Sequence, residues 1–144
     1  MDLLKIASVP AATVSPETTV LEAVRLMSDE RVGAVAVTRD GKLTGIFTER
    51  DLMIRVVLKG RDPGATPVGD VMTGQCISAK KDMSMGAALQ LMTERHFRHL
   101  PVVDENDRVL GLLSIRNLLH NRVDKLSQEL DSVVSFFTAD GGGG

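Results

Sequence analysis

The chain repeats its own residue pattern about halfway along its length, and this duplication restricts the possible folds more than any other feature. A helix-like stretch recurs 65 residues later with the same apolar spacing, as Val20, Ala23, Val24 and Met27 and then Met85, Ala88, Leu89 and Met92. The spacing becomes 66 residues at Gly111, where the second copy has one more residue in a turn. Because the register holds through helix-like and strand-like stretches, we expect two copies of one structural unit.

Each copy has the order strand, helix, strand, strand, helix. In the first copy, Thr19 and Glu22 form a capping box ahead of an amphipathic helix, which Gly33 ends. The same kinds of signal predict strands at 12–14, 34–37 and 43–47 and a second helix from about 49 to 60. We therefore expect an α+β fold of two tandem βαββα repeats, at 5–60 and 70–122, joined by a linker at 61–69 that is rich in glycine and proline.

Beyond Asn117 the two copies differ. Apolar residues continue in alternating steps of four and three, the spacing of a heptad seam, at Leu119, Val123, Leu126, Leu130, Val133 and Phe137. We expect a C-terminal helical extension at 123–138, and a homodimer to which it contributes, because one short repeat cannot cover so long a seam. A helix folded back across its own sheet is the alternative. The alanine, aspartate and four glycines at 139–144 predict a disordered tail.

Two equivalent stretches, 45–51 and 111–117, predict a strand that leaves a glycine and enters a helix at a hydroxyl residue. Thr48 and Ser114 would be the N-caps, with Asp51 and Asn117 three residues on. The start of a helix presents unpaired N–H groups and a partial positive charge, which suits a phosphate. A nearby carboxylate can accept the hydroxyls of a ribose. For one isolated copy, helix capping alone would be the simpler interpretation.

Composition excludes several classes of function. A formal net charge of −2 over 144 residues provides no basic surface for nucleic acid, and no stretch is apolar enough to cross a membrane. The single cysteine, Cys76, excludes an internal disulfide and favours a cytoplasmic location. His96 and His120 have no metal-ligand spacing, so we expect no metal site. Catalytic arrangements and phosphate-binding glycine loops are also missing from the sequence, which favours a protein that is not an enzyme.

Several features occur together in this chain: the tandem units, the lead-in Asp-Val-Met-Thr at 70–73 and the strand Arg-His-Leu-Pro-Val-Val at 98–103. They are joined by the two strand-to-helix stretches at 45–51 and 111–117, which we call the first and second elbow. In this combination the chain resembles a pair of CBS domains, often called a Bateman module, over about residues 5–122. The resemblance implies pseudo-twofold symmetry, a dimer, and regulatory binding of an adenosine nucleotide such as AMP, ADP or ATP in clefts between the repeats. We expect no effector domain within these 144 residues, so any output would pass through a partner protein.

The resemblance also implies which residues bind. The main ribose and phosphate site would consist of Thr48, Arg50, Asp51, Arg98, His99 and Arg116. The second site would use Ser114 and Asn117, and an adenine pocket would form at Ile46, Cys76 and Ile77. The positions facing the phosphates of the second site are Gly33 and Ala34, which have no charge. Arg50, which is also counted with the main site, is then the only basic residue expected near the phosphates of the second site. We therefore expect the second site to be weaker, since the neutral Asn117 holds a diol less firmly than a carboxylate.

Two other functions fit the same residues. The chain could be a structural dimerisation module whose clefts bind no ligand, although the basic groups and Asp51 argue against this. It could also sense another adenosyl ligand, such as NAD(H) or S-adenosylmethionine.

Overall fold

The first helix of each repeat begins after a hydroxyl residue that caps it. The computed structural model describes the backbone of residues 2–141 and the side chains of 2–137. The Thr19 hydroxyl accepts the N–H of Glu22 at 3.2 Å, and the helix α1 (Val20–Glu30) follows. In the second repeat the Ser84 hydroxyl accepts the N–H of Ala87 at 3.1 Å ahead of α3 (Met85–Arg95). The N-cap predicted at Thr19 is therefore confirmed, whereas the hydrogen bonds of residues 2–137 do not include the return bond from the Glu22 side chain that a full capping box needs.

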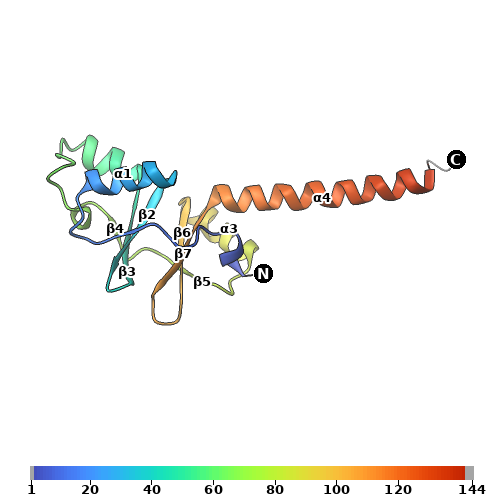
Figure 1. Cartoon of the computed structure of the whole chain (residues 1–144), viewed down its shortest axis with the longest axis horizontal. Helices are drawn as coiled ribbons and strands as arrows, with labels where there is room; N and C mark the ends of the chain where they lie inside the picture. Colours follow the sequence, from blue (N-terminus) through green and yellow to red (C-terminus); the bar gives the residue numbers. More distant parts are fainter. Residues whose placement is uncertain (1, 142–144) are drawn as a thin grey trace.

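Apart from one short strand near the start of the second repeat, the two repeats have the same order of elements, and the predicted α+β fold of two tandem repeats with a C-terminal helix is confirmed (Figure 1). The first contains, after the short 3₁₀ turn η1 (Leu3–Lys5), β1 (Thr13–Val14), α1, β2 (Ala34–Arg39), β3 (Lys42–Thr48), α2 (Glu49–Asp51) and the π-helical η2 (Leu52–Val57). The second contains, after η3 (Val68–Asp70), β4 (Thr73–Gly74), β5 (Ala79–Lys80), α3, β6 (His99–Val103), β7 (Val109–Ser114) and α4 (Ile115–Gly141).

Each sheet is completed by the segment that leads into the other repeat. The first sheet has the order β1-β2-β3-β4, with β4 antiparallel to β3. The second has the order β5-β6-β7, and Ser8 near the N-terminus forms an antiparallel bridge with Leu112 of β7. Glycine is required where these segments cross. A Cβ on Gly45 would lie 2.7 Å from the carbonyl oxygen of Thr73, and a Cβ on Gly111 would lie 3.1 Å from that of Ser8.

Each lead-in segment also contributes side chains to the hydrophobic core of the other repeat. Val68 and Val71, which lead into the second repeat, are buried in the core of α1, β2 and β3. Leu3, from the lead-in of the first repeat, is fully buried in the core of α3, β6 and β7. Separating the repeats would expose these side chains to water, so hydrophobic burial holds the two halves together.

Two element ends differ from expectation. The second helix of the first repeat ends at Val57 rather than Gly60, and it widens into a π turn in which the N–H of Leu58 donates to the carbonyl of Met53 at 3.0 Å. The helix α4 continues through Gly141, so the expectation of disorder is wrong for 139–141, where the backbone hydrogen-bonding pattern of the helix simply continues. Residues 142–144 lie outside the described part. No helix in that part is long and apolar enough to span a membrane.

Candidate functional site

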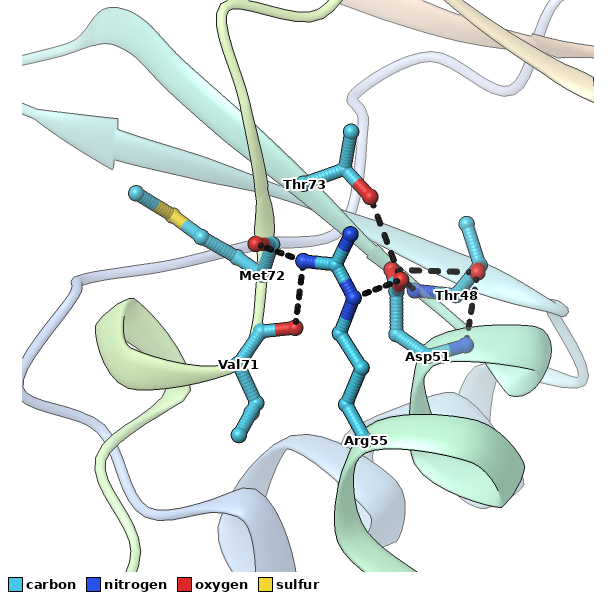
Figure 2. Close-up of polar contacts among 6 residues, drawn as sticks. All are labelled: Thr48, Asp51, Arg55, Val71, Met72 and Thr73. Carbon is cyan, nitrogen blue, oxygen red and sulfur yellow. Dashed lines mark hydrogen bonds and ion pairs between the residues drawn. The ribbon is translucent and has the colours of Figure 1, made fainter.

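The first elbow, where β3 enters α2, is held by a reciprocal capping box (Figure 2). The Thr48 hydroxyl accepts the Asp51 N–H at 3.2 Å, while Asp51 Oδ2 accepts the Thr48 N–H at 3.0 Å and its hydroxyl at 3.1 Å. Asp51 is only 6% exposed. The carboxylate that the sequence singled out is therefore buried and fixed in direction by its own helix start.

The other oxygen of Asp51 contacts two residues from elsewhere in the chain. Oδ1 accepts the hydroxyl of Thr73 at 3.1 Å and lies 3.7 Å from Nε of Arg55, one helical turn on. Arg55 also donates to the carbonyls of Val71 and Met72, at 3.4 and 2.7 Å (Figure 2). A carboxylate oxygen has two lone-pair sites, so Oδ2 is fully used and Oδ1 retains spare acceptor capacity.

The second elbow, where β7 enters α4, is simpler and has no carboxylate. The Ser114 hydroxyl accepts the Asn117 N–H at 3.0 Å, and within residues 2–137 this is the elbow's only side-chain hydrogen bond. Asn121 occupies the position equivalent to Arg55, and its Oδ1 is the one buried side-chain oxygen or nitrogen of the described residues without a hydrogen-bond partner. The two elbows therefore share a capping hydroxyl but differ in charge.

A cleft of about 830 Å³ opens above the first elbow, within the range that small-molecule sites occupy. Eight of the predicted residues line it: Ile46, Thr48, Arg50, Asp51, Cys76, Ile77, Arg98 and His99. The cleft thus combines a buried carboxylate, a helix start and several cations. Such a set can accept hydroxyl groups at one end and hold an anion at the other.

A smaller cleft of about 460 Å³ lies at the second elbow. Its lining includes Ser114 and Asn117, as expected, and also Arg116, which the sequence assigned to the main site. Arg116 is the equivalent of Arg50, and it lines the cleft of its own elbow. Arg31 and Arg98 line the smaller cleft too. The sequence predicted Arg50 alone for this second site, whereas in the structure Arg50 lines the main cleft and three other arginines line the smaller one.

Four residues, Gly33, Glu49, Arg98 and His99, line both clefts. A Cβ on Gly33 would collide with Glu49 and would lie 3.2 Å from Nε2 of His99, so the missing side chain leaves room for both groups. Burial lowers the pKa of His99 below its usual 6.5; Glu49 opposes this shift and Arg98 adds to it. The imidazole is therefore mostly neutral at pH 7, beside one carboxylate and one guanidinium.

The residues proposed for an adenine pocket lie on the apolar side of the main cleft. Ile46 is 6% exposed and belongs to a small cluster with Ala34 and Leu112, against which Cys76 packs. Burial raises the pKa of the Cys76 thiol, so the group stays protonated and apolar. This wall suits the face of a flat, uncharged ring.

Sequence reasoning missed several lining residues. Glu49, Arg55, Thr73, Arg95 and His96 line the main cleft, and Ser8 and Arg31 line the smaller one. The spacing of Arg55 from Asp51, one helical turn, was a usable signal. Arg31 and His96 are equivalents in the two repeats, and both end a helix in the left-handed conformation, with φ of 56° and 60°. No three His, Cys, Asp or Glu side chains in 2–137 form a group that could hold a metal ion.

Comparison with known proteins bears on the two repeats. The model of the CBS domain family matches residues 4–58 and 68–124. The CBS domain-containing protein YhcV of Bacillus subtilis is 41% identical over 116 residues, which are 81% of this chain and 81% of that protein. Both matched segments include one elbow and the lead-in before it.

Two solved structures with the same fold contain ligands. The crystal structure of CBSX2 in complex with AMP has a TM-score of 0.73 at 24% identity, over 85% of this chain and 96% of that one. The CBS domain pair of protein MJ0100, in complex with 5′-methylthioadenosine and S-adenosyl-L-methionine, has a TM-score of 0.79 at 21% identity. It covers 87% of this chain and 98% of that one. At these identities the likeness establishes the fold.

Proposed function

The chain belongs to the CBS domain family, as a tandem pair, and from this premise we propose that it is a regulatory module that binds an adenosine nucleotide of the AMP, ADP or ATP type. One observation carries the proposal. The buried carboxylate of Asp51 stands at a helix start inside a cleft of about 830 Å³ whose walls carry Arg50, Arg98 and His99. AMP and adenosyl ligands in CBSX2 and MJ0100 support the ligand class.

In the proposed main site each part of the nucleotide has its own group of residues. The ribose hydroxyls donate to Oδ1 of Asp51, the oxygen with spare acceptor capacity, beside Thr73. The phosphates lie near the N–H groups at the start of α2 and near the cations of the cleft. The adenine lies against Ile46, Cys76 and Ile77.

We propose the smaller cleft as the second site, with Ser114 and Asn117 toward the sugar. Asn117 supplies no charge-assisted acceptor, so sugar recognition is weaker here than at Asp51. Arg31, Arg98 and Arg116 give this cleft a stronger attraction for phosphate than the sequence indicated.

We further propose that the module is a homodimer and that its output passes through a regulated partner protein. The absence of catalysis and the cytoplasmic location stay predictions. S-adenosylmethionine or NAD(H) in place of the nucleotide is the alternative within the same class, and a ligand-free dimerisation module is the alternative outside it.

A thermal-shift panel tests the proposal. AMP, ADP, ATP, adenosine, NAD(H) and S-adenosylmethionine are each added to the full chain at millimolar concentration. A ligand at 100 times its dissociation constant adds about 2.7 kcal/mol to the free energy of unfolding, which raises the melting temperature clearly. A panel in which no ligand changes the melting temperature contradicts the proposal.

A pair of variants then tests the site. Arg98 is exposed and lines both clefts, so Arg98→Ala should weaken nucleotide binding without unfolding the protein. Arg25, exposed on α1 and outside both clefts, is the matched control, and Arg25→Ala should bind as the wild type does. Equal affinities of the two variants by calorimetry would remove Arg98 from the site.

A further inference from the structure

Most of α4 has no contact partner within the described chain. Leu118 is 2% exposed and packs in the second core, but every described side chain from Arg122 to Phe137 is exposed. Figure 1 shows α4 extending away from the two sheets along most of its length. A lone helix in water is only marginally stable, because most helices in proteins are stabilised by packing one apolar face.

The exposed part of α4 has such a face. Its apolar residues follow steps of four and three, and between 48% and 67% of each side chain is exposed: Leu119, Val123, Leu126, Leu130, Val133 and Phe137. We call these six residues the α4 seam. A repeat of 3.5 residues keeps a seam facing one partner only when that partner is another helix winding around it.

We propose that the α4 seam pairs with the α4 seam of a second copy as a parallel, in-register, two-stranded coiled coil. In heptad positions, Val123, Leu130 and Phe137 are at a, and Leu119, Leu126 and Val133 are at d. Valine at a followed by leucine at d, as at 123 and 126, favours two strands, whereas the next pair has leucine at a and valine at d, so the number of strands is also a result of the sedimentation experiment below.

Charge supports a second copy of this chain rather than a strongly charged partner. Between 122 and 137 the helix has two basic and three acidic residues, so its charges nearly balance: Arg122, Lys125, Asp124, Glu129 and Asp131. A helix of this kind meets an identical helix without strong repulsion. A highly basic or highly acidic partner would gain little electrostatic attraction from this helix.

Charge also selects the parallel orientation. In a parallel pair each g residue faces the e residue five positions on, so Arg122 faces Ser127 and Glu129 faces Val134 of the other helix. An antiparallel pair that aligned all six seam residues would place Glu129 opposite Glu129. Like charges at that place are unfavourable, whereas the parallel pair brings no like charges together.

The coiled coil does not depend on the proposed ligand sites. The residues lining the two clefts end at Asn117, before the seam begins. Failure of nucleotide binding and failure of the coiled coil are therefore separate results.

Sedimentation equilibrium of the full chain tests the pairing. The wild type should be a dimer at micromolar concentration. The double variant Leu126→Asn/Leu130→Asn should raise the dimer dissociation constant by about 100-fold, because it removes two buried leucine layers. The control Gln128→Asn/Ser132→Asn, on the opposite side of the helix, should remain a dimer. A monomeric wild type, or a double variant that dimerises as tightly as the control, overturns the proposal.

Cysteine cross-linking tests the orientation in a Cys76→Ala background. In the parallel register, Leu126→Cys faces its own copy and forms a disulfide-linked dimer under mild oxidation, as Leu130→Cys does separately. In the antiparallel register, cross-links form mainly when the two variants are mixed, since residues 126 and 130 then lie opposite each other. Cross-linking confined to the mixture overturns the parallel arrangement. Both substituted positions are exposed, so the sheets and clefts fold as in the wild type.

Discussion

Replacing Asp51 by alanine should destabilise the protein far more than the same change at Asn117, its equivalent in the second repeat. Asp51→Ala removes the acceptor for the Thr48 N–H and for two hydroxyls, and it removes the partner of Arg55. Asn117→Ala leaves intact the one hydrogen bond of its elbow, which uses the backbone N–H. The pair therefore compares the same substitution in two equivalent helix starts.

The expected size follows from the contacts. Loss of a capping box costs about 1 kcal/mol. The hydrogen bond from Thr73 to a buried carboxylate contributes about 1.5 kcal/mol. The ion pair adds at most about 1 kcal/mol, because the Arg55 side chain is 48% exposed and solvent screens it. Asp51→Ala should thus lower the free energy of unfolding by about 2–4 kcal/mol, and Asn117→Ala by less than about 0.5 kcal/mol.

Chemical denaturation with urea measures both values on the ligand-free protein. Thr73→Val serves as an intermediate variant, because it removes only the hydroxyl donated to Oδ1 and should lower the free energy of unfolding by about 1.5 kcal/mol. If the free energies of unfolding of Asp51→Ala and Asn117→Ala differ by less than about 0.5 kcal/mol, the hydrogen bonds around Asp51 do not stabilise the fold, and the reasoning fails. Nucleotide affinity is then measured at temperatures where each variant is folded, and Asp51→Ala should lose more of it.

Three further outcomes follow from the clefts and from α4. The free energy of unfolding should rise with pH just below 6.5, because the unfolded His99 takes up a proton that its buried form resists; His99→Gln should flatten that rise in denaturation measured from pH 5 to 8. Glu49→Gln should tighten ATP binding several-fold at low salt while leaving adenosine nearly unchanged, as calorimetry would detect, because the carboxylate repels phosphate from both clefts. Ending the chain after Arg122 should weaken self-association in sedimentation experiments and spare nucleotide binding; an unchanged dimer would exclude α4 from the interface.

The parts of the fold that the sequence predicted are those governed by local chemistry. The hydroxyl of Thr48 and the carboxylate of Asp51 lie three residues apart, so their capping box follows from the spacing alone. The repeat offset then transferred the capping hydroxyl to Ser114, without the return bond that Asp51 makes in the first elbow. These features need no knowledge of which strands pair.

The parts that the sequence did not predict depend on long-range pairing. Nothing in the spacing of Ser8 indicates that it reaches β7, or that Thr73 reaches the carboxylate of Asp51, because both contacts arise from the exchange of lead-in segments. Arg116 was assigned to the wrong cleft for a related reason. The sequence shows that it belongs to an elbow, but only the placement of the two repeats determines which cleft its side chain lines.

The two elbows differ at a pair of interacting residues rather than at a single position. In the first repeat Asp51 and Arg55 face each other across one helical turn, and removing either charge would leave the other without its partner. In the second repeat both are asparagine, at 117 and 121, so the charged pair is absent as a unit. The cations near that elbow, such as Arg116, consequently have no carboxylate at position 117 beside them, and the carboxylate that lines their cleft is Glu49 of the first elbow. If both clefts bind a nucleotide as proposed, the smaller cleft attracts it mainly by its phosphates, whereas the main cleft also fixes the ribose through Asp51. The same duplicated unit can therefore support two sites that read different parts of one nucleotide.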